Sequence, residues 1–128
     1  MTDILVVDDV VEAAETLALL FEAIGHVSYA AFDGAQALAL ARHHAPHIIF
    51  LDLDMPVLDG YSAARAIRNS DDGYNPFIVA LTGQSGDGAQ RAILAAGFDF
   101  YMFKPANTNA LFALVDDLSS RARARDAE

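Results

Sequence analysis

Residues 4–9 read ILVVDD, a run of four aliphatic residues that ends on two adjacent aspartates, and this stretch decides the fold. Residues 48–52 read IIFLD and repeat the pattern with one aspartate. Two more apolar runs, at residues 77–81 and 98–103, end beside a threonine and a lysine. If the four runs are parallel strands, their last side chains meet at one edge of a sheet, where open α/β sheets place their ligand sites. The side chains concerned are Asp8, Asp9, Asp52, Thr82 and Lys104.

Helical patterns fill the gaps between the apolar runs. Residues 11–24 carry apolar side chains three or four positions apart and stop before Gly25, which is typical of a helix end. Residues 35–44 are rich in alanine and stop before Pro46. The expected strands are residues 4–7, 27–31, 48–51, 77–81 and 98–103, and the expected helices are residues 11–24, 35–44, 61–69, 89–96 and 108–121.

The apolar runs are continuous rather than alternating, which indicates strands that helices bury on both faces through right-handed crossovers. A chain of 128 residues is long enough for one domain and too short for two of usual size. We therefore expect one α/β domain over residues 1–120, followed by a short charged tail over residues 121–128.

The composition excludes several classes of function. A hydrophobic content of 54% indicates a globular chain, and a net charge of -10 argues against direct binding of nucleic acid. The absence of cysteine excludes disulfides and thiolate chemistry, and it fits the cytoplasmic location that we expect. The apolar runs are too short to span a membrane, and no signal-peptide pattern is present, so we expect no membrane partner.

The residue types at the sheet edge point to phosphoryl chemistry. Neighbouring carboxylates repel by about 4 kcal/mol per pair at about 4 Å in an effective dielectric of roughly 20, so the cluster requires a cation. Oxygen ligands without histidine or cysteine favour Mg²⁺. Lys104 and Thr82 suit the oxygens of a phosphoryl group. Asp52 stands alone at its strand end and is the better nucleophile, which leaves Asp8 and Asp9 as the metal pair.

In this order, and together with Met55-Pro56, Asp59-Gly60 and Pro105, these residues resemble the receiver domain of two-component response regulators over essentially residues 3 to 120. The resemblance implies a flavodoxin-like, doubly wound sheet of five parallel strands in the order 2-1-3-4-5, with five helices on both faces. It also implies a cis peptide bond before Pro105.

The resemblance implies a phosphorylation-controlled switch rather than an enzyme with external substrates. Asp52 would accept a phosphoryl group from a sensor histidine kinase or a histidine phosphotransfer protein, and the chain would catalyse only its own phosphorylation and dephosphorylation. The implied ligands of Mg²⁺ are Asp8, Asp9, Asp52 and Asp54, the last through its backbone carbonyl. The implied contacts to the phosphoryl oxygens are Thr82 and Lys104.

The resemblance also implies a route for the signal. Thr82 would move toward the phosphoryl group and Tyr101 would swing inward. This change would alter the face formed by the helix at residues 89–96, the strand at 98–103 and the helix at 108–121, through which a homodimer could also form.

Two other functions stay open at this point. The sequence Asp52-Leu53-Asp54 resembles the Asp-x-Asp motif of haloacid-dehalogenase-type phosphatases, in which the first aspartate is phosphorylated and the second is a general acid. That motif normally follows the first strand rather than the third. A receiver-like interaction module that never takes phosphate is disfavoured, because every residue that the chemistry needs is present.

Some of the charged residues also have ordinary structural interpretations. Asp9 with Glu12 three residues later matches a capping box for the first helix. Asp33 and Asp59 are expected to be turn and cap residues. Several glycines make residues 83–88 the segment that we expect to be mobile.

Overall fold

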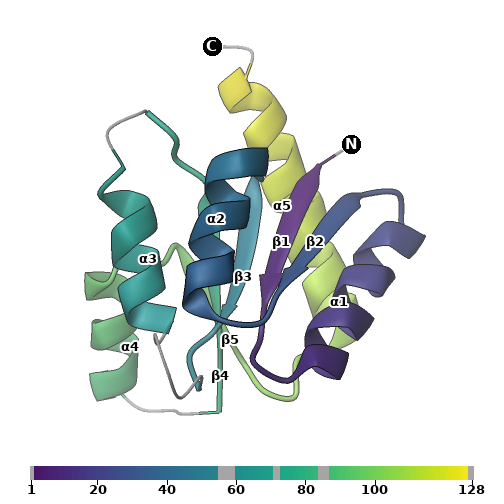
Figure 1. Cartoon of the computed structure of the whole chain (residues 1–128). Helices are drawn as coiled ribbons and strands as arrows, with labels where there is room; N and C mark the ends of the chain where they lie inside the picture. The colour runs from purple at the N-terminus through teal and green to yellow at the C-terminus, as the bar shows by residue number, and fades with distance from the viewer. Residues whose placement is uncertain (1, 55–59, 71–72, 84–86, 127–128) are drawn as a thin grey trace.

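The computed structural model describes residues 2–54, 60–70, 73–83 and 87–126, which alternate between strands and helices (Figure 1). The strands are β1 (Asp3–Val7), β2 (Val27–Ala31), β3 (Ile48–Asp52), β4 (Phe77–Thr82) and β5 (Phe100–Phe103). The helices are α1 (Val11–Ala23), α2 (Gly34–His44), α3 (Gly60–Arg68), α4 (Asp87–Ala95) and α5 (Thr108–Asp126). All strand pairs are parallel, and the order β2-β1-β3-β4-β5 confirms the flavodoxin-like topology.

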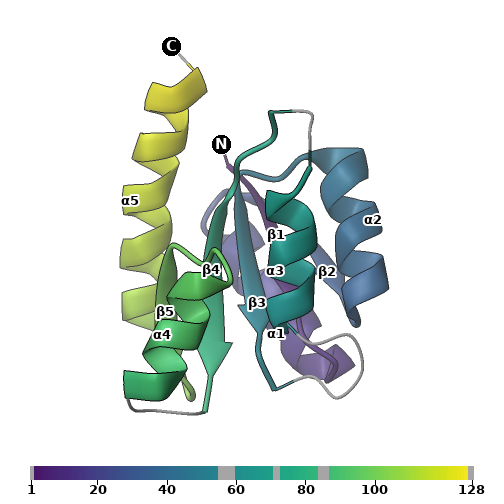
Figure 2. The ribbon, with the colours of Figure 1, turned by 90° about the vertical axis from the view of Figure 1, so that its left-hand side faces the viewer.

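The sheet lies between two layers of helices, as Figure 2 shows edge-on. One core joins the sheet to α1 and α5, and the other joins it to α2, α3 and α4. The central strands β1, β3 and β4 are almost completely buried, because helices cover both of their faces. The edge strands β2 and β5 are only partly buried. The continuous apolar runs in the sequence therefore predicted the layers correctly.

Local signals end the first two helices where the sequence predicted. Gly25 adopts a left-handed φ of 99° after α1, and its N–H donates to the carbonyl of Glu22. Ala45, with φ 46°, ends α2 before Pro46. The Asp33 carboxylate accepts from the N–H of Gln36 at 2.8 Å, which confirms Asp33 as the cap of α2.

The start of α1 differs from its prediction. Its N-cap is Val10, which makes no side-chain cap hydrogen bond, so the capping box of Asp9 and Glu12 is wrong. The N–H of Val10 instead donates to Oδ1 of Asp8 at 2.9 Å. The Asp8 carboxylate thus turns the chain into the helix, and Asp9 has no capping role.

The chain beyond β4 also differs in detail. β5 begins two residues later than predicted, and α5 runs to Asp126 rather than ending at Arg121. The start of the expected charged tail therefore continues the last helix, while the domain boundary at residue 120 stays a prediction. Asp59 and residues 84–86, half of the segment predicted to be mobile, lie outside the described residues.

Both ends of the described chain lie at the amino edge of the sheet, where the parallel strands begin (Figure 1). There the hydroxyl of Thr2 donates to the hydroxyl of Ser119 at 2.7 Å, and both side chains are buried. The last turns of α5 extend past this edge in both views (Figures 1 and 2). No helix in the described part of the chain is long and apolar enough to cross a membrane.

Candidate phosphoacceptor site

Three carboxylates meet at the carboxyl edge of the sheet. Asp52 is the last residue of β3, and Asp8 and Asp9 directly follow β1, its neighbour in the sheet. One carboxylate oxygen from each lies within 4.8 Å of the others. Asp52 is 2% exposed, Asp8 is half-buried and Asp9 is exposed. The parallel register explains why they meet. Val7 pairs with Leu51, so the next residues on the two chain segments, Asp8 and Asp52, lie side by side.

A lysine and an amide hold the buried carboxylate. Nζ of Lys104, the residue after β5, lies 2.7 Å from Oδ1 of Asp52 and 3.5 Å from Oδ2 of Asp54. The N–H of Asp54 donates to the same Oδ1 of Asp52 at 2.9 Å. The Lys104–Pro105 peptide bond is cis, as expected. A buried carboxylate needs such partners, because an unpaired charge of low exposure is strongly destabilising.

The pKa values reflect this crowding. Burial raises the pKa of Asp8 to about 6, and the neighbouring Asp52 carboxylate adds to the rise, while the N–H of Val10 and the Lys104 ammonium oppose it. Burial alone would lower the pKa of Lys104, but the carboxylates of Asp52, Asp8 and Asp54 outweigh it and raise that pKa. The site therefore carries more negative charge than one lysine can balance.

The donor set fits a hard divalent cation. All three clustered groups are carboxylates, which Mg²⁺ prefers, and the cluster contains no histidine or cysteine. Burial, and after it the Asp52 carboxylate, raise the pKa of Asp8 and so disfavour its ionised form, an effect that nearby positive charge would offset. A cation among Asp8, Asp9 and Asp52 would supply that charge. The Asp54 carboxylate lies beside this cluster rather than in it: its Oδ2 accepts from the N–H of Gly83 at 3.2 Å and lies 3.5 Å from Nζ of Lys104.

Thr82 and Tyr101 lie on the two strands beside this cluster. Thr82 ends β4, is 1% exposed, and follows the residue that pairs with Asp52. Its carbonyl accepts from the N–H of Lys104 at 2.9 Å, which ties the two strand ends together. Tyr101 is half-buried, packs against the α2–α3–α4 core, and meets the Phe103 ring edge-on at 5.6 Å between centroids.

A groove lies against the buried carboxylate of Asp52. It has a volume of about 980 Å³ and is lined by the acidic cluster, by α1 and by the start of α5. Its apolar lining includes Leu17 and Leu20 of α1 and Ala106 before α5. Val10 also lines it and is 57% exposed. The groove therefore combines the carboxylates of the cluster with apolar side chains of α1 and of the segment before α5.

Comparisons with known proteins agree with this geometry. The family described as the response regulator receiver domain matches residues 4–116. The chain belongs to this family. The receiver domain is 36% identical to the transcriptional regulatory protein PrrA of Mycobacterium tuberculosis over 92% of the chain and 50% of PrrA.

Solved receiver structures have the same fold. The receiver domain of the Francisella response regulator 1452 has a TM-score of 0.85 at 30% identity, covering 94% of this chain and 98% of that one. Chemotaxis protein CheY4 of Vibrio cholerae has a TM-score of 0.86 at 25% identity, covering 92% of this chain and 98% of that one. This chain spans about half the length of PrrA, so the activity of that whole protein is not carried over.

The family assignment settles one of the open alternatives. Receiver domains are signalling switches that take phosphate from histidine kinases. A haloacid-dehalogenase-type phosphatase built on Asp52 and Asp54 finds no support in the comparisons. In the structure Asp52 ends the third strand of the chain, and the Asp54 carboxylate contacts Lys104 and Gly83.

Gly60, which the sequence analysis named only as part of the Asp59-Gly60 pair in the resemblance, shapes the receiver site. Gly60 begins α3, and a Cβ there would lie 2.7 Å from Cδ2 of Leu53 and 2.8 Å from the carbonyl oxygen of Asp52. Glycine thus allows α3 to approach the backbone of Asp52. The close approach itself left no signal in the sequence, because it depends on tertiary packing.

Proposed function

We propose that this receiver domain accepts a phosphoryl group on Asp52 from a phosphohistidine of a sensor histidine kinase or a histidine phosphotransfer protein. The observation that carries the proposal is the setting of Asp52: a carboxylate 2% exposed, held at 2.7 Å by Lys104, beside two more carboxylates. A structural ion pair needs one acidic and one basic side chain, whereas in this cluster the carboxylates outnumber the single lysine.

The proposed transfer uses the carboxylate of Asp52 and the residues around it. A carboxylate oxygen of Asp52 attacks the phosphorus, the P–N bond of the phosphohistidine breaks, and its electron pair returns to the imidazole nitrogen. Lys104 and the Thr82 hydroxyl then face the phosphoryl oxygens. When bound by Asp8, Asp9, Asp52 and the Asp54 carbonyl, Mg²⁺ supplies positive charge that offsets the negative charge of the reacting groups. The domain would catalyse its own phosphorylation and dephosphorylation and no external reaction.

The output would pass through the face made by α4, β5 and α5. Thr82 moves toward the phosphoryl group and Tyr101 turns inward, because the two residues lie on paired strands. This face exposes apolar surface at Leu94, which is 61% exposed, and at Phe103, which is 44% exposed. Such surface suits a protein partner or a second copy of the chain, rather than nucleic acid. We place the domain in the cytoplasm, where histidine kinases present their phosphohistidine.

Intact-mass spectrometry tests the proposal. The purified chain is incubated with phosphoramidate and Mg²⁺ as wild type, as Asp52→Asn, and as Asp117→Asn, a control on the exposed surface of α5. We expect a gain of one phosphoryl group in the wild type and the control, and none in Asp52→Asn or in the presence of a chelator.

Other outcomes would overturn the proposal. No gain in any sample would make the chain an interaction module without phosphoryl chemistry. Steady consumption of phosphoramidate without a phosphorylated protein, persisting in Asp52→Asn, would place the chemistry on another residue.

A further inference from the structure

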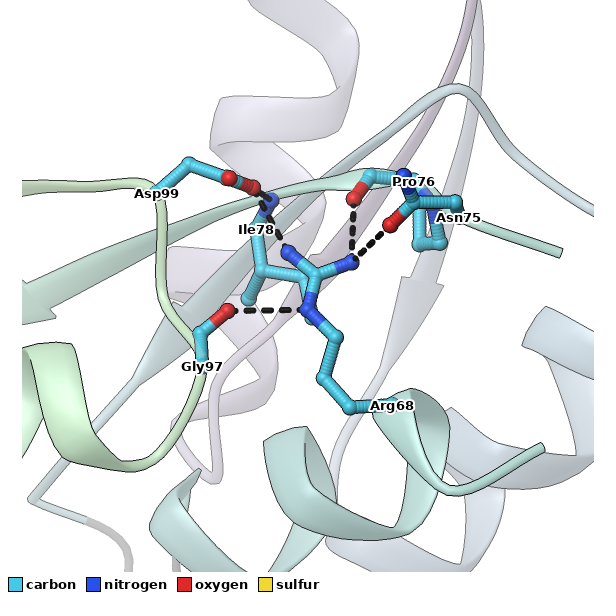
Figure 3. Close-up of polar contacts among 6 residues, drawn as sticks. All are labelled: Arg68, Asn75, Pro76, Ile78, Gly97 and Asp99. Atoms are coloured by element: carbon cyan, nitrogen blue, oxygen red, sulfur yellow. Dashed lines mark hydrogen bonds and ion pairs between the residues drawn. The ribbon is translucent and has the colours of Figure 1, made fainter.

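Arg68, the last residue of α3, joins three separate segments (Figure 3). Its partners lie before β4 and β5, so these contacts are at the amino edge of the sheet, whereas Asp52 ends β3 at the carboxyl edge. Its Nε donates to the carbonyl of Gly97 at 2.9 Å. One terminal nitrogen donates to the Asn75 side chain at 2.9 Å and to the Pro76 carbonyl at 2.7 Å. The other terminal nitrogen pairs with the Asp99 carboxylate at 2.7 Å. One guanidinium therefore joins the end of α3, the chain before β4 and the turn between α4 and β5.

Asp99 links Arg68 to the sheet through hydrogen bonds with the backbone of β4. The carboxylate oxygen that pairs with Arg68 also accepts from the N–H of Ile78 at 2.9 Å. The N–H of Asp99 donates to the carbonyl of Ile78 at 2.8 Å. Asp99 is thus bonded twice to the second residue of β4, directly before β5 begins. The pair fixes which residue of β5 lies opposite which residue of β4.

Gly97 belongs to the same arrangement. It has a φ of 98°, which side chains rarely adopt, and a Cβ there would lie 2.8 Å from Cγ of Arg68. The turn after α4 is therefore shaped around the stem of this arginine. A four-carbon lysine could not replace it, because the planar fork of donors reaches carbonyls and a carboxylate in different directions.

β5 needs such an external constraint on its register. It has four residues, lies at the edge of the sheet, and none of its residues is fully buried. Its Phe100 and Met102 pack against the α1–α5 core and its Tyr101 against the α2–α3–α4 core, but all three are only partly buried, so burial specifies its register less strongly than that of the central strands. A slip of one residue would move the following Lys104 by about 3.3 Å along the strand and would turn Tyr101 to the opposite face.

From these contacts we infer that Arg68 is a positioning residue that acts through Asp99. It sets the register of β5, and thereby holds Lys104 against Asp52 and Tyr101 on the α4–β5–α5 face. The inference rests on the proposed function for the chemistry of Lys104, while the register itself is independent of that function. The amino ends of β4 and β5 form a fixed end, and the phosphorylation switch moves their carboxyl ends relative to it.

Three variants separate the parts of this arrangement. Arg68→Met keeps the apolar stem and removes all donors. Arg68→Lys keeps the charge and loses the fork. Asp99→Asn keeps an acceptor for the N–H of Ile78 and weakens the pairing with Arg68. Arg65→Met, on the exposed side of α3, is the matched control.

The experiment measures three quantities under conditions where urea titration shows every variant to be folded. They are the rate of phosphorylation by phosphoramidate, the affinity for Mg²⁺, and the hydrogen exchange of backbone amides in β5 compared with β2. For Arg68→Met we expect a phosphorylation rate at least tenfold lower and faster exchange confined to β5 and its turn. The affinity for Mg²⁺ should be unchanged or higher, because its carboxylates follow β1 and β3, and a displaced Lys104 no longer competes for Asp52.

We expect Asp99→Asn and Arg68→Lys to show the same pattern to a smaller degree, and Arg65→Met to behave as the wild type. If Arg68→Met fails to fold, these two variants decide the question. A lower urea midpoint with unchanged phosphorylation rate and unchanged β5 exchange would reduce Arg68 to a general stabilising contact and overturn the inference. If the wild type takes up no phosphoryl group, the proposed function fails, while the exchange of β5 still tests the register.

Discussion

The two ends of the β4–β5 strand pair hold their charges in opposite ways. At the amino end, Arg68 has a partner for each of its three nitrogens, and the carboxylate of Asp99 is shared between that arginine and a backbone N–H. At the carboxyl end, Lys104 faces several carboxylates at once and cannot neutralise them. The first arrangement is complete within the chain and stabilises it. The second leaves negative charge that an added cation would balance, which fits the phosphoacceptor role that we propose for it.

The strongest test of this comparison is to remove the positive charge of Lys104 at the carboxyl end of the strand pair. We expect Lys104→Met to lower the rate of phosphorylation by about 100-fold, because it removes a charged donor to the phosphoryl oxygens. The rate is measured by intact mass against time, with phosphoramidate at fixed Mg²⁺. The apparent affinity for Mg²⁺ should rise in the same variant. A rate within twofold of the wild type would mean that Lys104 only balances charge.

The next test concerns Gly97, which lies beside Arg68 at the amino end of the strand pair. We expect Gly97→Ala to lower the free energy of unfolding by about 1–3 kcal/mol, because the methyl group meets the Arg68 stem and the backbone has a positive φ. Gly25→Ala is the control, since its φ is also positive but the space around it is open. It should cost roughly 1 kcal/mol or less. Both values come from urea unfolding, and equal losses would exclude any contribution from Arg68.

Acid should affect the two edges of the sheet in opposite directions, and this is the smallest effect that we predict. The folded state raises the pKa of Asp8 to about 6 from 3.8, so it holds a proton that the unfolded chain releases. Without metal, protonation of Asp8 therefore adds stability as the pH falls through about 6. Burial lowers the pKa of His26, which precedes β2 at the amino edge, so its protonation removes stability as the pH falls below 6.5.

Single variants separate these two contributions. In metal-free buffer, Asp8→Asn should be more stable than the wild type at pH 7, and this advantage should shrink toward pH 5. His26→Gln should lose less stability than the wild type does when the pH falls from 7 to 5, because it lacks the imidazole whose protonation destabilises the folded state. Urea unfolding at both pH values provides the measurement. An advantage of Asp8→Asn that grows toward pH 5 would contradict the sign given for Asp8.

The sequence predicted most of the fold because the governing signals are local. Continuous apolar runs identified four of the five strands, the weaker pattern at residues 27–31 gave the remaining strand, and Gly25 and Pro46 identified the ends of two helices. The start of β5 was placed too early because Gly97 and Asp99 form a turn whose geometry depends on Arg68. An arginine at the end of a helix has an ordinary explanation in the helix dipole, so its contacts with residues about thirty positions away left no signal.

For the candidate site, the sequence predicted which residues lie close together but not which side-chain contacts they make. Strand ends in a parallel sheet converge, so Asp8, Asp9, Asp52 and Lys104 could be grouped from the sequence. The contact between Lys104 and the side chain of Asp54 could not, because it depends on side-chain directions beyond the end of β3. The capping of α1 was predicted wrongly for the same reason, since Asp8 rather than Asp9 binds the turn.

The location of both chain ends at the amino edge has a practical consequence. An affinity tag, a fluorophore or a surface linker attached at either end would project away from the groove that leads to Asp52. The domain could therefore be immobilised by one end on a sensor chip, with its reactive edge facing the solution. Candidate kinases could then be passed over it and ranked by how fast each one transfers its phosphoryl group.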